Sequence, residues 1–114
     1  MNVISPRQHG YIDLVTVVVF ALAPVILGLD GAAAILSYVL AVVHLAMTVV
    51  TAGLPVSLRG DIPLALHGLV EMGVGLVLAL VGWLGFDGTA GNFYLVMAAV
   101  ILAVFAVTAY GAER

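Results

Sequence analysis

Four long runs of apolar residues follow one another along the chain, at about positions 10–29, 32–51, 64–84 and 92–110. Each run approaches the roughly 20 residues that an α-helix needs to cross the hydrocarbon core of a membrane. The runs do not alternate between apolar and polar positions, as the strands of a membrane β-barrel would. The pattern therefore predicts an all-α fold, a bundle of four transmembrane helices.

The breaks between these runs contain residues that end helices. Gly28, Asp30 and Gly31 separate the first two runs, and the glycine-rich segment 85–91 separates the last two. The middle break contains prolines, and Pro63 suits the first turn of the third helix. Asn92 is expected to cap the fourth helix. We expect a single membrane domain over residues 1–114, with a linker at about 52–63.

The composition narrows the class of protein further. Of 114 residues, 65% are hydrophobic and 8% are charged, against roughly 25% charged in ordinary soluble domains. A net charge of −3 with three basic residues excludes nucleic-acid binding. The absence of cysteine excludes disulfides, iron–sulfur clusters and cysteine zinc sites. The expected partner is the lipid bilayer. The first run is read as a permanent span, because the rest of the chain is equally apolar.

The basic residues predict the orientation in the membrane. Arg7 precedes the first run, Arg59 lies in the middle break and Arg114 ends the chain, whereas the other two breaks carry only Asp30 and Asp87. Cytoplasmic segments carry an excess of arginine and lysine. We therefore expect both termini and the middle linker to be cytoplasmic.

The two halves of the chain resemble each other. The segment from His9 to Asp13 aligns with the segment from His67 to Glu71, and residues 27–31 align with residues 84–88. The alignment predicts a two-helix unit that occurs twice, at about 9–51 and 67–110. A two-helix unit returns the chain to its starting side, so the two repeats would be parallel, related by an axis along the membrane normal.

The segments Ala23-Pro24-Val25 and Gly82-Trp83 occupy matching places late in the first helix of each half. In this the chain resembles the SPW-repeat proteins, small bacterial membrane proteins built from pairs of transmembrane helices and named for a Ser-Pro-Trp motif. Proline is kept in one half and tryptophan in the other. The resemblance implies a four-helix protein of the bacterial inner membrane and carries no known activity with it.

Ionisable side chains inside membrane spans are costly and rare, and they often mark functional sites. His9 and Asp13 lie four residues apart, as do His67 and Glu71, so each pair shares one helix face. His44 is expected at a similar depth near the end of the second helix. Five residues are thus predicted to converge near the cytoplasmic side: His9, Asp13, His44, His67 and Glu71.

Four interpretations of this cluster remain open. Imidazoles and carboxylates on facing helices suit a divalent transition metal. The pairs can instead be purely structural, fixing the register of the helices, or part of an interaction subunit. Asp13 can serve as the membrane carboxylate of a proton-coupled small-molecule exporter. Two histidines on different helices, His44 with His9 or His67, can also ligate haem b.

Two further expectations concern chemistry and assembly. No nucleophile elbow, phosphate-binding loop or dinucleotide-binding motif is present, so an enzyme is not expected. Gly68, Gly75 and Gly82 recur every seven residues, which favours close helix contacts in lipid. The bundle is thin, and we expect a homo-oligomer.

Overall fold

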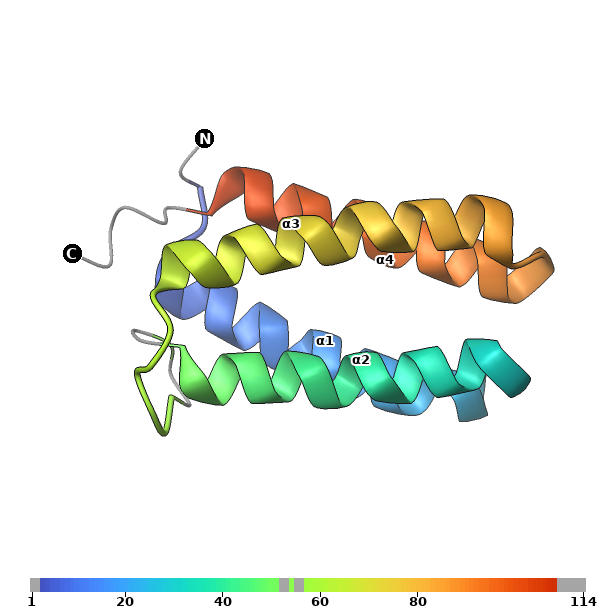
Figure 1. Cartoon of the computed structure of the whole chain (residues 1–114), viewed down its shortest axis with the longest axis horizontal. Coiled ribbons are helices and arrows are strands. Elements are labelled where there is room, and N and C mark those ends of the chain that lie inside the picture. Colours follow the sequence, from blue (N-terminus) through green and yellow to red (C-terminus); the bar gives the residue numbers. More distant parts are fainter. Residues whose placement is uncertain (1–2, 52–53, 55–56, 109–114) are drawn as a thin grey trace.

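The computed structural model describes residues 3–51, 54 and 57–108. Helix α1 spans Pro6–Ile26, α2 spans Gly31–Val50, α3 spans Leu64–Leu80 and α4 spans Gly88–Val107, and a π-helical turn, η1, extends α3 over Val81–Gly85 (Figure 1). With α3 and η1 taken together, all four helices are long and apolar enough to cross a membrane. The predicted all-α, four-helix fold is confirmed. Arg114 and the end of the fourth predicted run, residues 109–110, lie outside the described residues.

Helices α1 and α4 begin several residues before their apolar runs. Helix α1 starts at Pro6 because Ser5 and Gln8 form a capping box, in which each side chain accepts a hydrogen bond from the backbone N–H of the other residue. Helix α4 starts at Gly88, directly after the N-cap Asp87, so the expected cap at Asn92 is wrong. Pro63 is the N-cap of α3 rather than part of its first turn.

The helices form two hairpins, α1 with α2 and α3 with α4. Figure 1 shows both short turns at one end of the bundle, and the linker between α2 and α3 at the opposite end together with the outer ends of α1 and α4. The two hairpins therefore run in the same direction. Their origin as two parallel repeats stays a prediction.

Large aromatic side chains fill the core between the hairpins. Phe20 of α1 and Tyr94 of α4 are fully buried, and the ring of Phe93 lies 5.9 Å from that of Phe20 and 5.0 Å from that of Tyr94. The Tyr94 hydroxyl donates a hydrogen bond to the Ala33 carbonyl oxygen at 2.6 Å, which joins α4 to α2. A hydroxyl buried in an apolar core needs such a partner.

Many large apolar side chains lie on the outside of the bundle. Val25, Trp83 and Leu84 are each more than 70% exposed. On a soluble protein such a surface would mark an interface or an aggregation site. On a bundle that crosses a membrane it is the surface that faces lipid.

Candidate functional site

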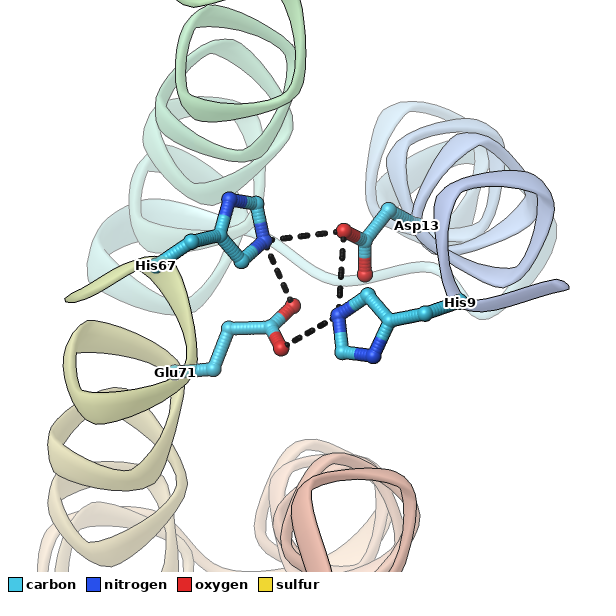
Figure 2. A group of neighbouring side chains, drawn as sticks. All are labelled: His9, Asp13, His67 and Glu71. Atoms are coloured by element: carbon cyan, nitrogen blue, oxygen red, sulfur yellow. Dashed lines mark hydrogen bonds and ion pairs between the residues drawn. The ribbon is translucent and has the colours of Figure 1, made fainter. Parts of the chain in front are cut away.

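Four polar side chains meet inside the bundle, at the end where the chain begins. His9 and Asp13 come from α1, and His67 and Glu71 come from α3 (Figure 2). Residues four apart lie on one face of a helix, so each pair points from its own helix toward the other. All four side chains are buried, with at most 5% of any residue exposed. We call these four residues the quartet.

The quartet forms a closed ring in which imidazoles and carboxylates alternate (Figure 2). Between the helices, His67 Nε2 lies 2.9 Å from Asp13 Oδ2, and His9 Nε2 lies 2.7 Å from Glu71 Oε2. Within each helix, the His9 Nε2–Asp13 Oδ2 and His67 Nε2–Glu71 Oε1 distances are both 3.3 Å. Each imidazole therefore directs its Nε2 atom at two carboxylates.

Two threonines hold the other nitrogen of each imidazole. His9 Nδ1 lies 2.8 Å from Thr108 Oγ1, and His67 Nδ1 lies 2.8 Å from Thr51 Oγ1. Both hydroxyls donate their single hydrogen to a carbonyl of their own helix, Thr108 to Val104 and Thr51 to Met47. Each hydroxyl oxygen therefore accepts a hydrogen bond from the imidazole. In both His9 and His67, the hydrogen of this bond is carried by Nδ1.

Each threonine is positioned by backbone pairing with the segment that leads into a histidine helix. The Ile4 N–H donates to the Val107 carbonyl at 2.9 Å, and the Ile62 N–H donates to the Val50 carbonyl at 3.0 Å. These contacts form isolated parallel bridges, Ile4 with Thr108 and Thr51 with Ile62. Each imidazole is thus anchored by the second helix of the opposite hairpin.

Neither threonine was predicted from the sequence to belong to the site. Thr108 lies 99 residues from His9 and Thr51 lies 16 residues from His67, so no local pattern joins them. One signal was present: Thr51 matches Thr108 in the second half, much as His9 matches His67.

His44 lies beside the quartet. It is 5% exposed on α2, and its Nε2 atom is 3.9 Å from Glu71 Oε1, too far for a direct hydrogen bond. Its ring packs against Phe20, with ring centres 5.7 Å apart. Neither ring nitrogen has a hydrogen-bond partner among the described residues. The structure thus brings all five predicted residues together, with His44 at the side of the ring.

The quartet has the composition and size of a metal-binding site. One donor atom from each of its four residues lies within 4.8 Å of all the others. Neutral imidazole nitrogens and carboxylate oxygens are the usual ligands of zinc and of several other divalent transition metals. The same groups also satisfy one another as ion pairs, so the ring can stand without an ion.

The chain was also compared with known proteins. No protein-family model matches it, and no curated protein or solved structure matches it. The resemblance to SPW-repeat proteins therefore stays a prediction.

Proposed function

We propose that this chain is an integral membrane protein that binds a divalent transition metal ion through His9, Asp13, His67 and Glu71. The observation that carries the proposal is the anchoring of both imidazoles through Nδ1 to Thr108 and Thr51. In metal sites the second nitrogen of a histidine ligand donates to an outer partner, which fixes the tautomer and aims the first nitrogen at the metal. The quartet already has this arrangement on both sides.

The charge of the quartet suits a divalent ion. Two carboxylates carry two negative charges, and a net charge inside a membrane span is strongly unfavourable. A divalent cation with two neutral imidazoles balances those charges, as two protonated imidazoles do in its absence. A monovalent or trivalent ion would leave an uncompensated charge in the buried site.

The distances within the ring also suit such an ion. With metal–ligand bonds of about 2.1 Å, neighbouring donor atoms of a tetrahedral site lie about 3.4 Å apart. The four contacts around the ring span 2.7 to 3.3 Å. Glu71 uses Oε2 toward His9 and Oε1 toward His67, and one donor atom from each residue lies within 4.8 Å of the others, so the side chains would rearrange to surround an ion.

The arrangement of the quartet argues against a haem site and an exporter carboxylate, and it leaves a purely structural ring as the main alternative. A haem held by His44 with His9 or His67 would need a large space beside the quartet, and the cavity that His44 and His67 line has a volume of only ≈ 10 Å³. Asp13 contacts both histidines and is not a solitary carboxylate of the kind an exporter uses. The purely structural ring is the strongest rival, because its charges already compensate one another.

Metal analysis of the purified protein separates the two interpretations. The protein is isolated in mild detergent, its metal content is measured, and its thermal unfolding is followed with and without added Zn²⁺. A ligand at about 100 times its dissociation constant stabilises the folded state by about 2.7 kcal/mol. We expect bound metal in the wild type and a clear rise in melting temperature with Zn²⁺.

Matched variants locate the effect. Glu71→Gln keeps the size of the side chain and removes one ligand charge, so it should lose the stabilisation by Zn²⁺. Asp61→Asn is the control, because Asp61 is an exposed carboxylate that pairs with Arg59 outside the bundle. A wild type that holds no metal and melts at the same temperature with Zn²⁺ would leave the quartet as a structural ring.

We further propose that the protein lies in the bacterial inner membrane with both termini cytoplasmic, which the arginine distribution supports. Single cysteines at positions 30 and 59 should then react with impermeant reagents from opposite sides. Labelling of both from one side would overturn this topology. The expected homo-oligomer is tested by mass measurement in mild detergent, where a monomer at all concentrations would count against it.

A further inference from the structure

His44 is a buried polar side chain that the quartet does not use. It is 5% exposed, and neither ring nitrogen has a hydrogen-bond partner among the described residues. Such a group is uncommon, because a buried polar atom without a partner costs free energy. The packing of Phe20 against the ring favours the present orientation. His44 therefore presents unused hydrogen-bonding capacity next to the proposed metal ligands.

A small cavity lies between α2 and α3 at this position. Its polar lining comes from His44, His67 and Glu71, and its apolar lining comes from Met47 and three valines. Its volume is ≈ 10 Å³, about what a single water molecule requires. We call it the His44 cavity. Its wall is mostly apolar, and it has room for one water-sized molecule, to which His44 and Glu71 offer polar contacts.

The distances around the cavity suit a bridging ligand. His44 Nε2 and Glu71 Oε1 are 3.9 Å apart, and one oxygen atom at about 2.8 Å from each can bond to both. Glu71 Oε2, in contrast, faces His9 at 2.7 Å. A molecule in the His44 cavity would therefore contact the quartet at Glu71 Oε1, on the side away from His9.

We propose that the His44 cavity holds a small monodentate oxygen donor, water or hydroxide, that binds the metal ion of the quartet and hydrogen-bonds to His44. This inference rests on the metal site proposed above. Catalytic zinc sites have three protein donors and one position for a water molecule and can expand to five ligands, whereas closed structural sites have four protein donors. With four quartet donors and one water molecule, the ion here would be five-coordinate. The His44 cavity would make this site one at which a ligand can be exchanged.

Pulsed EPR of the Cu²⁺-loaded protein in ¹⁷O-enriched water tests the proposal. Cu²⁺ is the probe because it binds nitrogen and oxygen sites most tightly among these divalent ions, and coupling to ¹⁷O detects water bound to the metal. We expect this signal in the wild type. His44→Leu should lose most of it but still bind Cu²⁺, with an affinity lower by at most about 10- to 100-fold, because His44 acts as an outer partner through the bound water molecule.

Two more variants make the test specific. Val74→Leu adds bulk to the cavity wall without removing a polar group, so it should also lose the water signal. It serves as the second variant if His44→Leu does not fold, which far-UV circular dichroism would show. Met47→Leu is the control, an apolar exchange of similar size in the same wall that should retain the signal.

The remaining outcomes overturn the inference in distinguishable ways. A wild type that binds Cu²⁺ without a water signal, or folded His44→Leu and Val74→Leu variants that retain it, would overturn the His44 cavity and leave the metal site standing. Loss of one directly bound imidazole ¹⁴N coupling from the Cu²⁺ spectrum in His44→Leu would make His44 a direct ligand instead and overturn the inference. A wild type that binds no Cu²⁺ would end the proposed function and this inference together.

Discussion

Thr51 and Thr108 orient the two imidazoles of the quartet without contributing charge. Replacing either by valine keeps the shape of the side chain and removes the acceptor for Nδ1–H. We expect Thr51→Val and Thr108→Val each to weaken Zn²⁺ binding about 10- to 100-fold, the usual cost of losing an outer-shell partner. Competition titration against a chromogenic chelator measures this change.

Thr16→Val is the matched control for these two variants. The Thr16 hydroxyl donates to the Ile12 carbonyl of its own helix, as the hydroxyls of Thr51 and Thr108 do within theirs, and it has no bond to a histidine. Its loss should leave Zn²⁺ affinity unchanged. Equal affinities for Thr51→Val, Thr108→Val and Thr16→Val would show that the threonines do not position the imidazoles.

At the residue scale, the sequence predicted which residues form the cluster better than it predicted the contacts between them. The spacing of four residues placed His9 with Asp13 and His67 with Glu71, because helical periodicity is local and regular. The contact of His67 with Asp13 spans 54 residues and depends on how two hairpins pack. No sequence periodicity specifies that packing, which is why the threonine anchors and the lateral place of His44 emerged only in the structure.

At the element scale, Gly82 allows η1 and α4 to approach closely. A Cβ atom at this position would lie 2.8 Å from the Leu95 backbone nitrogen and 3.0 Å from the Gly91 carbonyl oxygen. Neither backbone atom can move aside as a flexible side chain can. We expect Gly82→Ala to destabilise the protein by about 1–3 kcal/mol, as overpacking generally does, measured as a lower melting temperature.

Gly73→Ala is the control on the same helix. Nothing lies within 4 Å of the Cβ position of Gly73, so alanine meets no steric obstacle there. Alanine also favours the helix over glycine by up to about 1 kcal/mol. The melting temperature should stay constant or rise, and a fall as large as that of Gly82→Ala would refute the packing argument.

The helix ends show what hydropathy can and cannot predict. Apolar runs located all four helices, because lipid favours helices wherever a long apolar segment occurs. They missed the first turns of α1, where Arg7 and Gln8 are polar yet helical. They also missed the start of α4, because Gly88 and Gly91 look like turn residues but lie inside the helix. A capping box marks the start of α1, whereas no side-chain cap bond marks the start of α4.

At the scale of the whole molecule, the two hairpins are joined near both ends of the bundle. The quartet and its threonines join them at one end, and the hydrogen bond from Tyr94 to Ala33 joins them farther along. An ion in the quartet would bind α1 and α3 at the same time. Metal binding and the association of the hairpins are therefore expected to stabilise each other.

The backbone hydrogen bond from Ile4 to Val107 suggests that the order of the two hairpins along the chain can be exchanged. This bond places residues 4 and 107 side by side. A short linker can therefore connect the end of α4 to the start of α1. The new termini of the permuted chain are then placed in the segment between α2 and α3. Circular permutants tolerate such cuts at exposed connections. Each hairpin returns the chain to its starting side, so the permuted order α3, α4, α1, α2 preserves the direction of every helix.

We expect this permutant to insert, to melt near the wild-type temperature and to bind Zn²⁺ within about threefold of the wild-type affinity. Far-UV circular dichroism and the same chelator titration measure these properties. A permutant that inserts but binds no metal would mean that the original connection between the hairpins, and not their packing, assembles the quartet. If the permutant binds Zn²⁺, either hairpin can be synthesised first. The metal site then depends only on the packing of the two hairpins in the membrane.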